Sequence, residues 1–428
     1  MCAERESTWT DPRTPAALSR RKFLTVSGAA GATYLFSSAI GTPAAAAGRG
    51  KKRVYVLVVD GCRPDEITPE LTPNLAALRD GGRNHPRARS MPIMETIPNH
   101  VMMMTGVLPR RSGVPANAIY DRAEGEVRDL DRKKDLRFPT VIQRLNRAGY
   151  TTGTVLSKEY LYGIFGDRAT HRWEPAPIVP VSGHAPDVFT MDAAISMVEE
   201  FDPNLVFVNL GDIDRMGHVD LTGGTVKALR QAALLSTDLQ VGRFVDLLKS
   251  SGRWKNSVVM VLADHSMDWS QPHRIINLQP ALEADPVLAG NVVIADNGGA
   301  DLLYWTGPRS RRKEAWQRMR AIALGTEGVL SVHRPKRLGL GPEAGDLVVY
   351  CKAGWRFSDP AAYDNPIPGN HGHPATRPIP FFIGGGSRLV PKGTSSGALA
   401  RTLDVAPTVG SIFGLPAPRG GYDGRARL

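Results

Sequence analysis

The stretch VYVLVVDG at residues 54–61 decides the fold, because it joins an uninterrupted apolar run to an abrupt acidic end. A short valine-rich run of this kind is typical of a parallel strand that is buried on both faces of a sheet. Asp60 stands where that strand is expected to stop. The stretch therefore predicts a buried parallel strand at 53–59 with a carboxylate at its carboxyl end.

Two later stretches repeat this arrangement. PNLVFVNLGDIDRMGH (203–218) and SVVMVLADHSMD (257–268) each place ionisable side chains behind an apolar run. In an open α/β sheet, ligands bind outside the carboxyl ends of the strands. We therefore expect these side chains to converge with Asp60 at one edge of the sheet. They are Asp214, His218, Asp264 and His265.

The pattern along the chain alternates between strand and helix, which is the signature of a parallel sheet covered on both faces. The fold class predicted is therefore α/β, a three-layer sandwich with a mostly parallel central sheet. The expected strands are 53–59, 151–156, 205–210 and 257–262, and the expected helices are 71–80, 138–148, 187–201 and 224–250.

The pattern changes in the segment 275–365, which we predict to be a smaller inserted α+β subdomain. The chain then returns to its core through RPIPFFIGGG (377–386) and a helix at 403–414. The core is thus predicted to consist of 53–274 and 366–428. Within the insertion we expect strands at 291–294, 301–305 and 346–351 and a helix at 311–324.

The stretch METIPNH at 94–100 contains a further candidate site residue, Thr96, which carries a hydroxyl group. A small polar turn here feeds an apolar helical run, so Thr96 is expected at a helix N-terminus, where N–H groups and the dipole favour bound phosphate. His371 adds another imidazole. Six carboxylates and imidazoles are too many for one tetrahedral zinc ion and right for two. The residues therefore predict a two-metal hydrolase of phosphorus esters, in which Thr96 attacks phosphorus.

Six motifs in fixed order make the chain similar to a known family. They are VVDG (58–61), TIPNH (96–100), TGVLPRRSGV (105–114), DRMGH (214–218), ADH (263–265) and GNHGH (369–373). On these motifs the chain resembles the alkaline phosphatase superfamily and, within it, the type I phosphodiesterase/nucleotide pyrophosphatase family, from about Arg53 to Pro416. The resemblance implies an alkaline-phosphatase-like fold and a division of the ligands. One ion would be held by Asp60, Thr96, Asp264 and His265, and the other by Asp214, His218 and His371.

The resemblance also decides between neighbouring candidates. Its spacing selects Asp214 over Asp212 and His371 over His373. It further implies that Asn99 donates its side-chain amide to a phosphoryl oxygen. The alternative for Asn99 is an Asx turn before the helix.

Two departures from the family bear on the substrate. Nucleotide pyrophosphatases usually have an aromatic residue after the nucleophile, where this chain has Ile97. Lys158 resembles the lysine of monoester phosphatases and phosphonoacetate hydrolases, but the second basic residue expected two positions later is Tyr160. Lys158 is therefore either a catalytic residue that contacts the substrate or a solvated surface lysine.

Residues 1–46 predict a twin-arginine signal peptide. The sequence SRRKFL (19–24) precedes an apolar stretch that is diluted by small residues and followed by PAAAAG. We expect export by the twin-arginine machinery and a secreted or cell-envelope location; the alternative is an ordinary disordered tail. We find no other run long enough to span a bilayer, so no stable membrane anchor is expected.

The charge of the chain and the placement of its basic residues indicate which kinds of ligand it could bind. The net charge of +11 favours a small phosphorylated anionic substrate, although a solvated surface without a partner gives the same charge. The basic clusters KKR (51–53) and RSRRK (309–313) lack interleaved aromatic residues, so no nucleic-acid-binding domain is expected. Cys62 and Cys351 are predicted to be free thiols rather than a disulfide.

The function predicted is an exported two-metal phosphoric ester hydrolase of the phosphodiesterase/nucleotide pyrophosphatase type, with two divalent ions, zinc above all. It would act through a phosphothreonine intermediate. The enzymatic alternative is a phosphomonoesterase or phosphonate hydrolase of the same superfamily. A third alternative is a non-catalytic, metal-dependent anion-binding protein, although such a protein has no need of Thr96.

Overall fold

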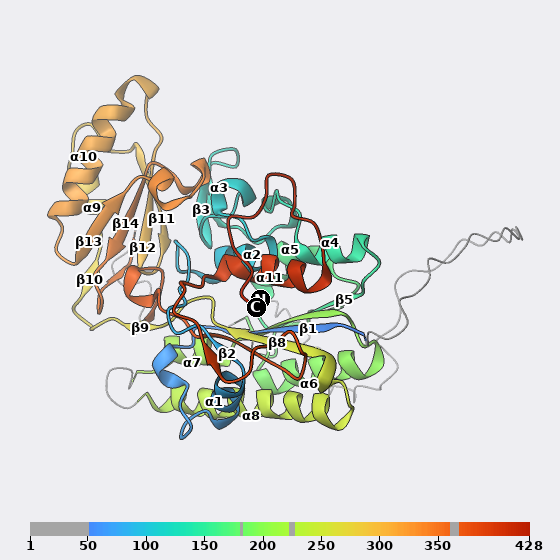
Figure 1. Ribbon diagram of the computed structural model, residues 1–428. Coiled ribbons are helices and arrows are strands. Elements are labelled where there is room, and N and C mark those ends of the chain that lie inside the picture. The colour runs from blue at the N-terminus through green and yellow to red at the C-terminus, as the bar shows by residue number, and fades with distance from the viewer. Residues whose placement is uncertain (1–50, 180–182, 222–226, 360–367) are drawn as a thin grey trace, which may run out of the picture. The chain divides into compact units, whose positions relative to one another are not determined.

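The computed structural model describes residues 51–428 apart from 180–182, 222–226 and 360–367 (Figure 1). The signal peptide predicted for 1–46 lies outside the described residues. Within the described part of the chain, no helix is both long enough and apolar enough to cross a membrane.

The middle layer of the fold is a mostly parallel sheet. Its strands are β1 (Arg53–Val59), β2 (Arg83–Asn84), β5 (Thr152–Leu156), β6 (His171–Trp173), β7 (Leu205–Leu210), β8 (Ser257–Leu262), β17 (Phe381–Gly384) and β18 (Thr394–Ser395). They lie in the order β18-β2-β17-β8-β1-β7-β5-β6. The strands from β8 to β6 run parallel, and β17 joins the sheet antiparallel to β8.

The strand that carries Asp60 lies between the two strands that carry the other predicted ligands. Strand β1 pairs with β7 on one side and with β8 on the other, in register from Val54 onward. Val59 is level with Leu210, and Val58 is level with Leu262. The strands therefore end at one edge of the sheet, as the apolar runs predicted.

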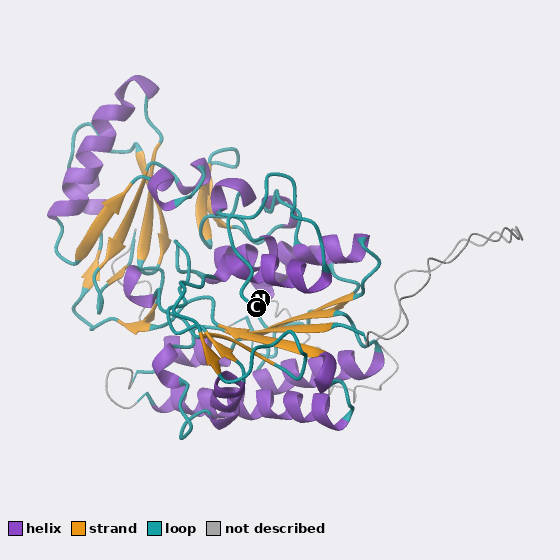
Figure 2. Cartoon of the chain, in the orientation of Figure 1, coloured by secondary structure: helices purple, strands orange, loops and turns teal. Residues whose placement is uncertain are grey.

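Helices cover both faces of this sheet, which completes the three layers (Figures 1 and 2). On one face lie α1 (Pro73–Gly81), α6 (Asp187–Glu200) and α8 (Ala228–Ser250). On the other lie α2 (Thr96–Thr105), α4 (Val141–Arg147), α5 (Glu159–Phe165) and α11 (Val405–Phe413). The predicted α/β class is confirmed.

Helix α2 is buried along its whole length, which explains why much of its sequence consists of apolar residues such as methionine. It begins at Thr96 after an extended Glu95 and ends at Gly106, whose φ of 69° is left-handed. A Cβ atom at Gly106 would lie 2.6 Å from the ring of Tyr422, so both the turn and the close packing require glycine.

Some predicted helices differ from the observed ones. The helix expected at 138–148 begins only at Val141, because the Thr140 side chain accepts a hydrogen bond from the Gln143 N–H at 3.2 Å and caps the first turn. The helix α5 and a further short helix, α7 (Asp212–Val219), follow directly after strands and were not predicted. Each has only about two turns, too few to show a clear helical period.

A second, antiparallel sheet lies in the segment predicted to be an insertion. It consists of β11 (Val292–Asn297), β12 (Ala300–Trp305), β13 (Val329–His333) and β14 (Leu347–Cys351), with α10 (Arg312–Gly325) against it. The strand order is β11-β12-β14-β13. A separate apolar cluster supports this sheet, and its fully buried members lie between Ile276 and Phe357. The division of the chain into a core and an inserted subdomain stays a prediction.

Candidate active site

The predicted ligand residues come together at the carboxyl ends of β1, β7 and β8. All except the partly exposed His218 are buried. The residues brought together are Asp60, Thr96, Asp214, His218, Asp264, His265 and His371.

One group of these side chains meets at the imidazole of His265, beside the Thr96 hydroxyl. The Oγ1 atom of Thr96 lies 3.2 Å from Nε2 of His265. The same Nε2 atom lies 3.5 Å from Oδ2 of Asp264 and 3.7 Å from Oδ1 of Asp60. These are the residues that the resemblance assigns to the first ion.

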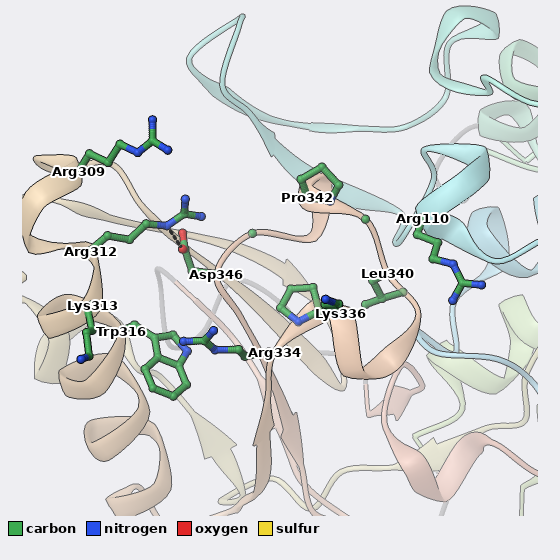
Figure 3. A pocket seen from close by; sticks show the side chains of 13 residues that line it. Arg110, Arg309, Arg312, Lys313, Trp316, Arg334, Lys336, Leu340, Pro342 and Asp346 are labelled. Carbon is green, nitrogen blue, oxygen red and sulfur yellow. Dashed lines mark hydrogen bonds and ion pairs between the residues drawn. The ribbon is translucent and has the colours of Figure 1, made fainter.

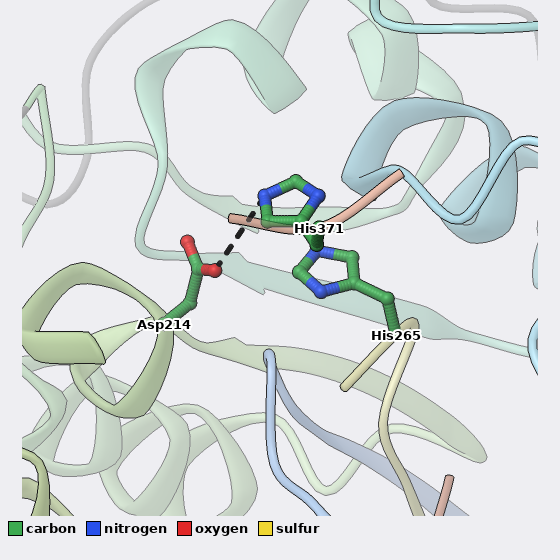
Figure 4. Close-up of side chains that lie close together, drawn as sticks. All are labelled: Asp214, His265 and His371. Atoms are coloured by element: carbon green, nitrogen blue, oxygen red, sulfur yellow. Dashed lines mark ion pairs between the residues drawn. The ribbon is translucent and has the colours of Figure 1, made fainter. Parts of the chain in front are cut away.

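The second group lies directly beside the first. The Nε2 atoms of His371 and His218 are 3.1 Å apart, and they lie 3.8 and 3.4 Å from Oδ1 of Asp214. Figure 4 shows Asp214, His265 and His371 together, and the rings of His265 and His371 are stacked with centroids 3.7 Å apart. The two predicted ligand sets therefore form one continuous cluster.

The three imidazoles are held in the same way, through Nδ1. His218 Nδ1 lies 2.8 Å from the Gly369 carbonyl oxygen, and His265 Nδ1 lies 3.0 Å from the Ser266 carbonyl oxygen. His371 Nδ1 lies 3.0 Å from Oε1 of Glu95. An acceptor at Nδ1 favours the tautomer that carries its proton there, and each ring turns its Nε2 atom into the cluster. This is the arrangement that histidine ligands of a metal ion require.

Carboxylate oxygens that accept no hydrogen bond also support a metal site. Among the described residues, Oδ1 of Asp214 and Oδ2 of Asp264 are buried and accept no hydrogen bond. A buried acceptor without a partner is costly, and a cation removes that cost. The donor set of carboxylates, imidazoles and one hydroxyl thus fits divalent metal ions.

Lys158 connects the two groups. Its Nζ atom lies 2.9 Å from Oδ1 of Asp60 and 2.7 Å from Oδ2 of Asp214, and the side chain is fully buried. Burial lowers the pKa of Lys158, but the two carboxylates outweigh burial and raise it. Burial in turn opposes ionisation of Asp214, yet Lys158 holds the pKa of that carboxyl well below its usual range. Lys158 is therefore no solvated surface lysine, and its predicted contact with the substrate stays a prediction.

Asn99 lies in a different environment from the one predicted. Its side-chain amide donates to the carbonyl oxygens of Met91, Ile93 and Glu95, at 3.2, 2.9 and 3.0 Å. Its Oδ1 atom accepts a hydrogen bond from the Met91 N–H at 2.9 Å. Asn99 thus fastens the loop before α2, and this geometry does not support its predicted contact with a phosphoryl oxygen.

Asn117 is a candidate that the sequence interpretation missed. Its Oδ1 atom accepts from the Ile97 N–H at 2.8 Å, and its amide donates to Oε2 of Glu95 at 2.6 Å. Unlike Asn99, it lines the same pocket as Thr96. The end of the motif SGVPAN (112–117) was the available signal, but nothing in that stretch indicated which way Asn117 points.

The pocket over the cluster has a volume of about 290 Å³. Thr96, Asp214, His218 and His371 line it on the side of the cluster. The other lining side chains come from several segments and include Ile97, Asn117, Asp129, Tyr160, Arg215 and Asn370.

Arg215 is a second residue that the sequence interpretation missed. Its guanidinium carbon lies 5.5 Å from the centre of the Tyr160 ring. Its Nε atom is buried without a hydrogen-bond partner, and none of the described carboxylates forms an ion pair with it. Arg215 therefore places a cation in the pocket wall, beside the position where the second basic residue was expected. A basic residue between the paired positions 214 and 218 was the available signal.

Asp212 and His373, the candidates that the family spacing did not select as ligands, have other partners. Asp212 accepts a hydrogen bond from the N–H of Asp187 at 3.0 Å, at the start of α6. His373 lies 2.9 Å from Asp268 through its Nε2 atom.

Cys62 and Cys351 are buried and free.

One known protein family matches most of the chain. The profile of the type I phosphodiesterase / nucleotide pyrophosphatase family matches residues 54–374. The chain therefore belongs to this family, as the sequence motifs predicted.

Relatives with curated names are distant. Human ectonucleotide pyrophosphatase/phosphodiesterase family member 5 is 24% identical over 246 residues, which cover 55% of this chain and 49% of the relative. Human bis(5'-adenosyl)-triphosphatase is 23% identical over 400 residues, or 88% of this chain and 81% of the relative. The chain thus spans about half the length of the first of these relatives.

Solved structures share the fold. The inactive variant of murine ectonucleotide pyrophosphatase / phosphodiesterase 5 in complex with AMP has a TM-score of 0.71 and 18% identity, covering 86% of this chain and 96% of that one. Phosphonoacetate hydrolase from Sinorhizobium meliloti 1021, with bound phosphonoformate, has a TM-score of 0.65 and 19% identity, covering 85% and 95%. At these identities the likeness concerns the fold alone.

Proposed function

We propose that the protein is an exported two-metal phosphoric ester hydrolase of the phosphodiesterase/nucleotide pyrophosphatase type, which acts through a phosphothreonine intermediate. One observation carries the proposal: three imidazole Nε2 atoms and three carboxylates converge beside a threonine hydroxyl. Packing alone gives no reason to bury such a set of groups together.

The ligand sets would be those implied by the family. Bound divalent ions, for which we propose zinc, would lower the pKa of the Thr96 hydroxyl and stabilise negative charge on the phosphoryl group. Asp60, Thr96, Asp264 and His265 would hold one ion, and Asp214, His218 and His371 the other.

The reaction divides into two displacements at phosphorus. In the first, Oγ1 of Thr96 forms a bond to phosphorus while the bond to the leaving oxygen breaks, and that oxygen departs with the electron pair and takes up a proton. In the second, water adds to the phosphothreonine, the bond to Oγ1 breaks and the hydroxyl regains its proton. Thr96 is suited to this role because it begins α2, where the helix dipole favours negative charge.

The substrate is proposed to be a small phosphorylated anion, because the pocket of about 290 Å³ is at the small end of the range for ligand pockets. A diester needs room for a second group and carries one negative charge. The aliphatic Ile97 in the pocket wall offers no aromatic face for a base. Phosphodiesters without a stacked base are therefore the substrates that we put first.

A second candidate is a phosphomonoesterase or phosphonate hydrolase that uses the same site. Arg215 favours it, because a dianionic substrate needs extra positive charge in the pocket, and Arg215 lines the pocket without an ion pair to any described carboxylate. A non-catalytic, metal-dependent anion-binding protein is the third candidate, and the buried Thr96 hydroxyl beside His265 speaks against it.

The test is a comparison of kcat/KM for bis-p-nitrophenyl phosphate and p-nitrophenyl phosphate with zinc-loaded protein. Faster diester hydrolysis supports the first proposal, and faster monoester hydrolysis supports the second. No turnover of either ester, or of phosphonoacetate, by folded protein with bound metal would support the third. The Thr96→Ala variant, prepared identically, gives the background rate.

A further inference from the structure

A second concentration of positive charge lies outside the candidate active site. It surrounds a groove of about 940 Å³ that lies between the start of α10, the segment 334–342 and α3 (Pro109–Ser112) (Figure 3). The residues lining this groove and those lining the pocket at Thr96 have no member in common within the described chain. The basic residues of the groove are Arg110, Arg309, Arg312, Lys313, Arg334 and Lys336.

Most of this charge is not neutralised by the protein. Asp346 is the carboxylate in the groove wall, and it is already paired with Arg312 at 2.6 Å. Arg110 pairs with Asp423 at 3.3 Å. The other basic residues form no ion pair with any described carboxylate. They are Arg309, Lys313, Arg334 and Lys336. The groove therefore carries a surplus of positive charge, which calls for an anionic ligand.

The kind of anion follows from the donors and from the single aromatic side chain. Arginine guanidinium groups match phosphate oxygens with paired donors, and the groove contains both arginines and lysines. The ring of Trp316 is covered by the guanidinium of Arg334, whose carbon lies 4.0 Å from the ring centre. Single-stranded nucleic acids are bound largely by stacking of bases on free aromatic faces, and this face is not free.

The size of the groove further restricts the ligand. A volume of about 940 Å³, with basic residues from three separate segments, exceeds what one phosphate ion needs. A chain of linked phosphoryl groups would contact the segments together and would release the counterions of each. We propose that this groove is a binding site for linear polyphosphate, separate from the site of ester hydrolysis.

The test uses the full chain and a labelled inorganic polyphosphate, with binding followed by fluorescence anisotropy at several salt concentrations. The groove variant carries Lys313→Glu and Lys336→Glu, both at exposed positions. The matched control carries Lys255→Glu and Lys352→Glu, which are also exposed, lie outside the groove and change the net charge equally. Hydrolysis of p-nitrophenyl esters by each protein shows that the candidate active site is intact.

We expect the groove variant to bind polyphosphate at least tenfold more weakly, with a salt slope lower by about two, because two phosphate contacts are lost. The control variant should stay within twofold of the parent. Equal affinities of the two variants would overturn the proposal, since net charge or the catalytic pocket would then account for binding. So would tighter binding of a single-stranded oligonucleotide than of polyphosphate at equal salt, with the same sensitivity to the groove variant.

Discussion

Glu95 and His371 form a buried contact in which Oε1 of the carboxylate lies 3.0 Å from Nδ1 of the imidazole. Glu95 immediately precedes Thr96, so one short segment both presents the proposed nucleophile and orients a proposed ligand of the second ion. A carboxylate at the distal nitrogen of a histidine ligand fixes the ring and strengthens its donor atom. Glu95 is thus a positioning residue.

Replacement of Glu95 by glutamine should weaken metal binding without unfolding the protein. We expect about a 10- to 100-fold loss of affinity for one of two ions, the range found for such carboxylates. Metal titration measures the loss, and circular dichroism checks the fold. The exposed Glu126→Gln variant should bind as the parent does. Unchanged affinities in Glu95→Gln would remove it from the metal site.

Thr96→Ala should abolish turnover while metal content and fold stay close to those of the parent. The hydroxyl group is the proposed nucleophile, and loss of a positioned nucleophile typically costs several orders of magnitude in kcat. Rates with both p-nitrophenyl esters, on protein with verified metal content, measure the effect. Activity within a few-fold of the parent would exclude a phosphothreonine intermediate.

Chelators should remove activity, and Zn²⁺ should restore it, with about two ions bound per folded chain. Asp214→Ala should deplete one ion in preference to the other, because Asp214 belongs to the second ligand group. Elemental analysis of the active protein measures the ratio. A fully active protein with a single ion, or none, contradicts the two-metal proposal.

Arg215 and Lys158 should differ in how they affect substrates of different charge. Arg215 lines the pocket and forms no ion pair with a described carboxylate, so Arg215→Met should depress kcat/KM for a dianionic monoester more than for a diester. Lys158 is already paired with Asp60 and Asp214, so Lys158→Met should depress both substrates to a similar extent. The ratio of the two kcat/KM values is the measurement. If only Lys158→Met loses monoester activity selectively, then Lys158, and not Arg215, is the residue that contacts the extra negative charge of the monoester.

Replacement of Asn99 should lower mainly the stability of the protein, and replacement of Asn117 should lower mainly its activity. Asn99→Ala removes the side-chain donor to the Met91 carbonyl oxygen and the acceptor of the Met91 N–H and the Thr402 hydroxyl, all buried, and we expect a loss of about 3 kcal/mol in unfolding free energy. Asn117→Ala, at the pocket wall, should lower kcat with a smaller effect on stability. Thermal unfolding and rate measurements on both variants test the division. The opposite pattern would restore Asn99 as the residue that contacts the phosphoryl group.

The strands that position the site could be predicted because buried parallel strands appear in the sequence as continuous apolar runs. The acidic residues behind β1 and β8 stand out against those runs, and the adjacency of β7, β1 and β8 brings them together. The roles of Asn117 and Arg215 could not be predicted in this way. Whether each side chain faces the pocket depends on tertiary packing between distant segments, and Asn99, in the more familiar motif, turns its amide towards its own loop.

The ammonium group of Lys158, held between Asp60 and Asp214, affects the charge balance at the ends of the strands. Buried carboxylates without a counterion repel one another and would hold the strand ends apart, at a cost of several kcal/mol. Lys158 supplies a counterion that is covalently part of the chain and arrives with it. The repulsion between Asp60 and Asp214 is therefore offset by a residue of the chain itself, so this edge of the sheet does not depend on a bound cation alone.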